Sequence, residues 1–169
     1  MMFFAILVTL TTLLFTPMGQ PVDKIPPRGI GAIKIVNTLD SPLYAWSDPD
    51  PQGSMYTIPG RSGTYEETYR LSPTGDAISI KVSKTPDRKV NDAIQFKYTL
   101  SGDRVLWAVS CANIRPGSPF TRRGFSVHPS SAGCPSINCA PGDDKCPQVH
   151  PWSNTTHRCG LTTSLTLKL

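Results

Sequence analysis

Hydrophobic and polar residues alternate with a period of two along most of the chain after residue 31. Such alternation places one face of a strand against a core and the other in water, which is typical of antiparallel sheets. The pattern therefore predicts an all-β protein. The runs that carry the alternation are 33–35, 78–82, 94–100, 105–109 and 161–169.

Short segments rich in Pro, Gly, Ser and Asp separate these runs. Proline presets φ and glycine tolerates positive φ, so such segments favour turns. The segment 101–103, Ser-Gly-Asp, is typical of a tight hairpin between two strong strands. About nine short strands at this spacing predict an antiparallel β-sandwich rather than an open sheet. No segment shows a convincing helical period, and 111–118 is the one place where we expect a short helical turn.

Composition agrees with a single β domain. The chain has 169 residues, of which only 17% are charged, and it contains 13 Gly and 17 Pro, so a long-helix or coiled-coil protein is disfavoured. Hydrophobic residues at 38% are enough for a packed core. The net charge of +5 is spread along the chain and does not indicate a nucleic-acid partner. We expect a monomer.

The first 19 residues carry no charge and are almost wholly apolar from Phe3 to Phe15. A run of about 13 residues is too short to span a bilayer but fits the core of a signal peptide. Pro17 and Gly19 interrupt it, so we expect cleavage after Gly19 or Gln20; the alternative is a buried N-terminal helix. We expect residues 20–30 to be a flexible lead-in, residues 31–169 to form the domain, and no segment to span a membrane.

Four of the five cysteines lie in the final third of the chain, in a stretch rich in Pro, Gly and Ser. Such a stretch cannot build its own core, so we expect disulfides to stabilise it in an oxidising compartment. Simple pairings are Cys134 with Cys159 and Cys139 with Cys146. Spacing alone does not fix the connectivity. Cys111 is either a buried free thiol or part of a different pairing.

Asn154 begins the sequence Asn-Thr-Thr, an acceptor for N-glycosylation in a polar loop. The acceptor matters only if the chain is exported. It is therefore consistent with the predicted signal peptide and does not prove it.

The sequence gives little support for a metal site. His128, His150 and His157 lie beside the cysteines, but zinc sites use closely spaced Cys pairs, whereas here four residues separate Cys134 from Cys139 and six separate Cys139 from Cys146. In a secreted chain the thiols would oxidise before they coordinated a metal. Asp48 begins a partial calcium loop that has Pro59 where a bidentate Glu is required. We expect no metal and no cofactor.

Glu67 is the one candidate catalytic residue. Glu66 and Glu67 are adjacent in a predicted strand, so they point to opposite faces and cannot form a carboxylate pair. Glu67 shares its face with Tyr65 and Tyr69, which is unusual for a core, so this face is either exposed or lines a groove. A glycosidase would need a second carboxylate across a cleft. Asp76 and Asp103 are the candidates for it.

Aromatic side chains give a binding hypothesis. Tyr44 and Trp46 share one face of a predicted strand, as do Tyr65 and Tyr69. Exposed rings of this kind can stack on the apolar face of a sugar. The alternative is that Trp46 and Trp107 are simply core anchors.

Several segments resemble a known family. The segments 32–37 and 41–47 are similar to the opening of the fungal secreted BYS1 domain, named for a yeast-phase-specific protein and often described as antigenic thaumatin-like. The likeness continues in order over about residues 31–169. The later segments that carry it are 63–70, 77–82, 94–100, 119–120, 134–137 and 165–167.

The resemblance implies a secreted, thaumatin-like β-sandwich with a largely undefined biochemical role. Members carry a cysteine after the first strand and another at the C-terminus, where this chain has Leu39 and Leu169. Loss of both is what loss of one bridge between the terminal strands would produce. Larger thaumatin-like proteins have an acidic cleft linked to glucan binding, but the resemblance supplies no catalytic residue here.

The sequence thus predicts a non-catalytic extracellular or cell-surface binding protein, with a wall glycan or a host component as its partner. Its basic charge modestly favours anionic partners, an attraction that salt would weaken. The alternative is a weak thaumatin-like glycan hydrolase that uses Glu67.

Overall fold

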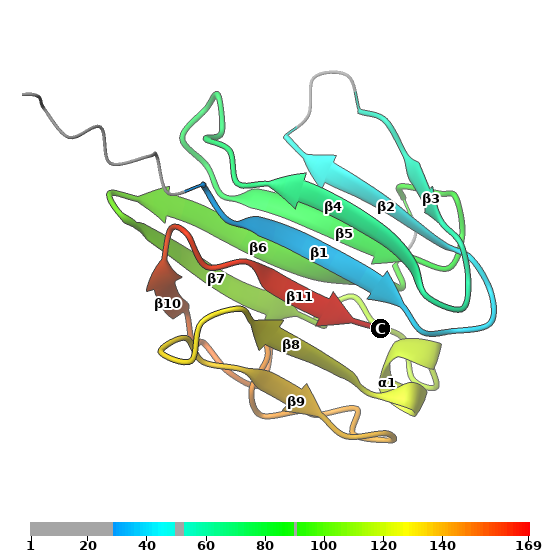
Figure 1. Cartoon of the computed structure of the whole chain (residues 1–169). Coiled ribbons are helices and arrows are strands. Elements are labelled where there is room, and N and C mark those ends of the chain that lie inside the picture. The colour runs from blue at the N-terminus through cyan, green and yellow to red at the C-terminus, as the bar shows by residue number, and fades with distance from the viewer. Residues whose placement is uncertain (1–28, 50–52, 90) are drawn as a thin grey trace, which may run out of the picture.

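The computed structural model describes residues 29–49, 53–89 and 91–169. The predicted signal peptide, residues 1–19, and most of the predicted lead-in lie outside the described residues. The described chain forms two packed β-sheets and one short helix (Figure 1). The predicted all-β sandwich is therefore confirmed. Within the described ranges, no helix has the length and hydrophobicity that a membrane span requires.

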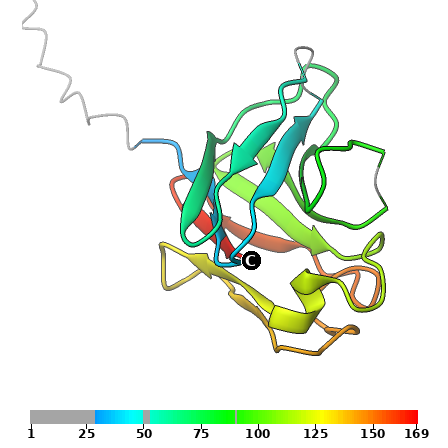
Figure 2. The same cartoon turned by 90° about the vertical axis from the view of Figure 1, so that its right-hand side faces the viewer.

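The first sheet has five strands in the order β4-β1-β11-β8-β9. Its pairs are antiparallel except β1 with β11, which are parallel, so the first and last strands lie side by side (Figures 1 and 2). This parallel pair is the one departure from the predicted antiparallel pattern. The strands are β1 (Ala32–Asn37), β4 (Gly63–Thr68), β8 (Phe125–Pro129), β9 (Ile137–Cys139) and β11 (Leu165–Lys168).

The second sheet has six strands in the order β10-β7-β6-β5-β2-β3, all antiparallel. The predicted hairpin joins β6 to β7: Ser101 pairs with Arg104, and Gly102 takes the positive φ of 58° that the tight turn requires. The strands are β2 (Leu43–Asp48), β3 (Tyr56–Ile58), β5 (Ile78–Ser83), β6 (Ala93–Ser101), β7 (Arg104–Ser110) and β10 (His157–Gly160).

The core lies between the sheets and is built from the alternating apolar residues. Ile33 and Ile35 on β1 face it from the first sheet, and Phe96 on β6 and Trp107 on β7 face it from the second. The Phe96 and Trp107 rings stack with their centroids 5.6 Å apart. Burying each such side chain stabilises the fold by about 1.5–3 kcal/mol. Trp107 is thus a core anchor.

Two local predictions differ from the structure. The run 161–169 is a strand only from Leu165, because Thr163 N–H donates to Gly160 C=O and forms a turn after β10. Helix α1 (Pro119–Arg123) follows the segment 111–118 in which a helical turn was expected. With five residues it is too short to show a helical period. It ends at Gly124, whose φ of 73° disfavours residues with a side chain.

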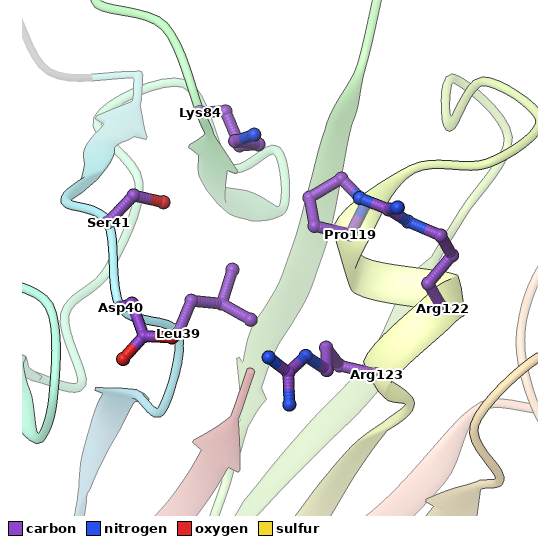
Figure 3. A pocket seen from close by; sticks show the side chains of 7 residues that line it. All are labelled: Leu39, Asp40, Ser41, Lys84, Pro119, Arg122 and Arg123. Atoms are coloured by element: carbon purple, nitrogen blue, oxygen red, sulfur yellow. The ribbon is translucent and has the colours of Figure 1, made fainter.

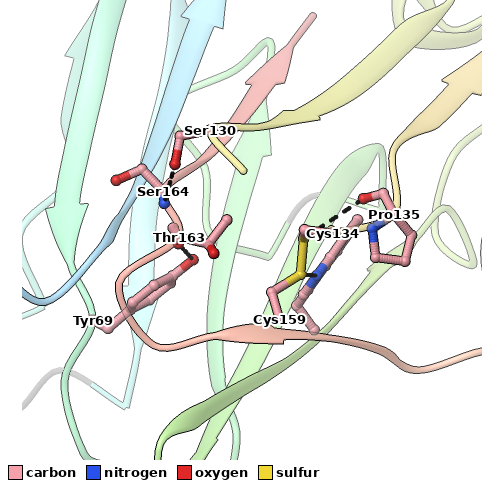
Figure 4. Close-up of a disulfide and its surroundings, with 8 residues drawn as sticks. Tyr69, Ser130, Cys134, Pro135, Cys159, Thr163 and Ser164 are labelled. Carbon is pink, nitrogen blue, oxygen red and sulfur yellow. Dashed lines mark hydrogen bonds between the residues drawn. A yellow bond between two sulfur atoms is a disulfide. The ribbon is translucent and has the colours of Figure 1, made fainter. Parts of the chain in front are cut away.

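Two disulfides close the C-terminal third. Figure 4 shows one of them, Cys134–Cys159. Cys134–Cys159 joins the segment before β9 to β10, and so connects the two sheets, while Cys139–Cys146 closes the loop after β9. These are the two pairs that spacing suggested. Cys111 is buried and is the one free cysteine among the described residues.

Candidate binding site at the edge of the sandwich

Strand β4 is an edge strand of the five-stranded sheet, and its residues alternate between partly buried and exposed. Tyr65 and Glu67 pair with the core residues Ile35 and Ile33 of β1, so their side chains turn toward the six-stranded sheet. Glu66 is exposed on the other face. The two glutamates therefore lie on opposite faces, as the alternation predicted.

Three donors surround the Glu67 carboxylate. Tyr65 Oη donates to Oε2 at 2.7 Å and Tyr98 Oη to Oε1 at 3.0 Å. Arg70 Nε donates to Oε1 at 3.1 Å and forms an ion pair. Since Tyr98 is on β6, the carboxylate connects the edge of one sheet to the centre of the other.

Arg70 extends this network to a third region. Its Nη2 donates to Ser47 Oγ on β2 at 2.9 Å, and its Nη1 donates to the Pro49 carbonyl at 3.1 Å. The Glu67 side chain is 14% exposed and that of Arg70 is 32% exposed. A pair so shielded interacts more strongly than a surface ion pair, and its donors are shared between both sheets. The cluster Ser47, Tyr65, Glu67, Arg70 and Tyr98 is called the Glu67 network below.

The two tyrosines of the network are held in their neutral, donating form. Burial raises the pKa of Tyr65, and the neighbouring Glu67 raises it further. Burial also raises the pKa of Tyr98, with a further contribution from Glu67. Each hydroxyl therefore remains a hydrogen-bond donor to the carboxylate well into the alkaline range.

Neither candidate for a second carboxylate joins this network. Asp76 is exposed and accepts a hydrogen bond from Thr74 Oγ1 at 2.8 Å. Asp103 lies 3.4 Å from Arg104 Nε in the β6–β7 turn. In the described residues, no hydrogen bond or ion pair links either aspartate to Glu67 or to its partners. Among the described residues, the two aspartates are therefore engaged elsewhere and are not part of the Glu67 network.

Two of the four predicted sugar-stacking residues are corrected by the structure. Trp46 is only 2% exposed and Tyr69 only 4%, so neither ring is open to a ligand. Tyr69 lies just beyond β4, where its hydroxyl donates to the Thr163 carbonyl at 2.9 Å (Figure 4). Its ring packs against that of Tyr98 with the centroids 5.2 Å apart. Tyr44, on the outer face of β2, is partly exposed.

An aromatic surface nevertheless remains beside the Glu67 network. Tyr56 on β3 is 52% exposed, and its ring lies edge-on to that of Tyr65 with the centroids 5.6 Å apart. Strands β3 and β4 are the edges of the two sheets on this side, so the pair lies at the rim of the sandwich. We call Tyr56 and Tyr65 the tyrosine ledge. Sequence reasoning missed Tyr56 because a three-residue strand is too short to show alternation.

The histidines are dispersed. His128 lies 2.9 Å from Ser126 Oγ, whereas the His157 ring packs 4.5 Å from Trp107, and burial lowers its pKa. In the part of the chain that the structure describes, no three His, Cys, Asp or Glu side chains come close enough to hold a metal ion. Asn154 is exposed and lines a hollow of about 240 Å³ together with His150.

The chain was compared with known proteins. The family model Bys1, described as Blastomyces yeast-phase-specific protein, matches residues 27–169. The secreted thaumatin-like protein calA of Emericella nidulans is 32% identical over 170 residues, which cover 99% of this chain and 98% of that protein. The antigenic thaumatin-like protein of Arthroderma benhamiae is 34% identical over 143 residues, which cover 83% of this chain and 71% of that protein.

Two solved structures share the fold. The protein elicitor MoHrip2 from Magnaporthe oryzae matches with a TM-score of 0.65 and 24% identity, over 82% of this chain and 98% of its own. The thaumatin-like xylanase inhibitor TLXI matches with a TM-score of 0.53 and 10% identity, over 80% of this chain and 97% of its own. Both likenesses concern the fold alone.

Proposed function

Because the chain belongs to the Bys1 family of Blastomyces yeast-phase-specific proteins, we propose that it is an extracellular protein that acts by binding rather than by catalysis. The related proteins are named secreted or antigenic thaumatin-like proteins. Two disulfides within the domain suit the same oxidising compartment. One structural neighbour is a protein elicitor and the other is a xylanase inhibitor.

The observation that carries the proposal is the engagement of Glu67. A general acid donates a proton to the leaving group, and a nucleophile presents a free oxygen. Both oxygens of Glu67 instead accept hydrogen bonds, from Tyr65, Tyr98 and Arg70. These hydrogen bonds support a structural role for Glu67. They argue against the alternative, a weak glycan hydrolase.

The tyrosine ledge supports a glycan as the target. Tyr56 presents an exposed ring at the rim, and its edge-on contact with Tyr65 holds it there. A flat aromatic surface beside hydrogen-bonding groups is what stacking on a sugar requires. Arg70, which is partly exposed, is the nearby donor of the Glu67 network. We therefore infer that a wall polysaccharide binds across the ledge.

Co-sedimentation with insoluble β-glucan, chitin and xylan tests the proposal. We expect the protein to pellet with at least one of them and Tyr56→Ala to lose most of this binding. Trp152→Ala is the matched control, because Trp152 is also an exposed aromatic residue, at 43%, and lies outside the ledge. Equal binding by Tyr56→Ala and the unmodified protein would contradict the ledge. Failure to pellet with any polysaccharide would leave a host component as the target.

A further inference from the structure

A basic hollow lies on the sandwich beside helix α1 (Figure 3). Its volume is about 340 Å³, in the range of small-ligand sites. Three cations line it: Lys84, which follows β5, and Arg122 and Arg123, which occupy the last turn of α1. The remaining lining residues are Leu39, Asp40, Ser41 and Pro119.

The three cations are unpaired within the part of the chain that the structure describes. Among the ion pairs and side-chain hydrogen bonds of the described residues, none involves Lys84, Arg122 or Arg123. Asp40, the one acid of the hollow, is engaged outside it by Arg61 at 3.1 Å. In Figure 3 the side chains of Lys84 and Arg123 extend from opposite walls toward the space between them. Like charges directed at one space favour an anion there.

The other lining groups narrow the chemistry of that anion. Two apolar residues also line the hollow: Leu39, which is buried, and Pro119 of α1, which is partly buried. Ser41 adds a hydroxyl, which suits the hydroxyl groups of a ligand, and the Asp40 carboxylate at the margin, paired with Arg61, would repel a second anionic group. Arginine forks pair well with planar carboxylates. The required ligand has one carboxylate, several hydroxyls and an apolar face.

We propose that this hollow binds the carboxylate of an acidic sugar, such as one unit of a polyuronate chain. The site is distinct from the tyrosine ledge and does not depend on it: no residue of the ledge lines the hollow. The uronate carboxylate pairs with Arg123 and Lys84, its ring lies against Leu39 and Pro119, and a hydroxyl reaches Ser41.

Binding of a short oligogalacturonate, measured by titration calorimetry, tests this assignment. We expect the acid form to bind, the fully methyl-esterified form not to bind, and an increase from about 0.05 to about 0.5 M NaCl to weaken binding. Arg122→Gln/Arg123→Gln should weaken it about tenfold. The matched control is Arg104→Gln/Arg158→Gln, which removes the same charge from the exposed ends of β7 and β10.

Several results would overturn the proposal. Equal binding of the methyl ester would show that hydroxyl contacts, not the carboxylate, hold the ligand. Equal weakening by the control pair would show that only the net charge matters. Equally tight binding of polyglutamate would assign the hollow to an acidic protein, and inhibition by inorganic phosphate at low concentration would assign it to a phosphate. Tyr56→Ala should leave oligogalacturonate binding unchanged. Thermal unfolding shows whether the Arg122→Gln/Arg123→Gln variant is folded. If it is not, Lys84→Gln tests the same site and should also weaken binding.

Discussion

Glu67 is a carboxylate in an interface that is otherwise largely apolar. A buried polar group lowers stability unless its hydrogen bonds are satisfied. Here Tyr65, Tyr98 and Arg70 satisfy them, and the donors come from both sheets. Glu67, which the sequence suggested as a catalyst only for the alternative hydrolase, therefore links the two sheets through its hydrogen bonds.

Replacing Glu67 should therefore lower stability. Glu67→Gln removes the ion pair with Arg70. It also replaces one carboxylate oxygen, an acceptor, with an NH₂ group that faces the donors of the network. We expect a loss of about 2 kcal/mol, because hydrogen bonds to charged groups contribute about 1.5–3 kcal/mol and this site is partly solvated. For a domain of this size the melting temperature should fall by about 4–8 °C.

Circular dichroism during heating measures this change. Glu66→Gln is the matched control, since Glu66 is the adjacent exposed residue on the other face, and its melting temperature should stay within about 1 °C of the unmodified protein. An unchanged melting temperature for Glu67→Gln would refute the structural role of this carboxylate.

Cys111 should resist alkylation in the native protein. Burial raises the pKa of its thiol from an ordinary 9.0 to about 12. Because the folded pKa is the higher one, the protonated thiol stabilises the fold below about pH 9, and this contribution is lost as the pH rises toward 12. At about pH 10 the thiolate fraction should be roughly 100-fold lower in the native than in the unfolded chain.

Mass spectrometry after timed iodoacetamide treatment checks this difference in rate. The native protein should gain no label during the time in which the protein in urea gains one. Labelling of the native protein at the unfolded rate would show that Cys111 is exposed.

At the scale of elements, long alternating runs were predictable and short ones were not. The strands β5, β6 and β7 show their period in the sequence because each has at least six residues with one buried face. Strands β3 and β9 have three residues each, so no period exists to detect. They form because neighbouring strands offer them hydrogen bonds, which depends on the tertiary fold.

The same limit applies to the candidate site. Alternation predicted that Glu67 shares a face with Tyr65, and this holds. It could not predict Tyr98 or Ser47 as partners, since these come from β6 and β2 of the other sheet and meet Glu67 only when the sheets pack. Alternation also predicted that Tyr69 lies on the face of Tyr65 and Glu67. The strand ends at Thr68, however, so the alternation does not extend to Tyr69.

The two disulfides should differ in their contribution. Cys134–Cys159 joins the two sheets and spans 25 residues, whereas Cys139–Cys146 closes a local loop of 7 residues. The chain-entropy model predicts that they stabilise the fold by about 3.5 and about 2.5 kcal/mol respectively. Urea unfolding under non-reducing conditions should therefore show a larger loss for Cys134→Ala/Cys159→Ala than for Cys139→Ala/Cys146→Ala. The reverse order would mean that the link between sheets is not the more important one.

At the scale of the whole molecule, the two binding surfaces that we propose are separate. The tyrosine ledge lies on the edge strands β3 and β4, and the basic hollow lies beside α1. Figure 1 shows these strands and the helix in different parts of the molecule. The net charge of +5 favours the approach of anionic polymers to either surface. Specific binding then depends on the few side chains that each surface provides.

Export should leave two marks on the whole molecule. When the full chain is produced in a fungal host, we expect the secreted protein to begin at Gln20 or Pro21 and to carry an N-glycan on Asn154. N-terminal sequencing and the mass before and after endoglycosidase treatment measure both. Asn154→Gln should abolish the mass difference. Retention of residues 1–19 in a cell-bound product would contradict the predicted signal peptide.

Release of reducing ends from β-glucan, chitin and xylan, followed over a long incubation, tests the central claim of binding without catalysis most directly. We expect the unmodified protein to release no more reducing ends than a blank without protein, even from a polysaccharide with which it pellets. Release above the blank that Glu67→Gln abolishes, at a temperature where this variant is folded, would contradict it.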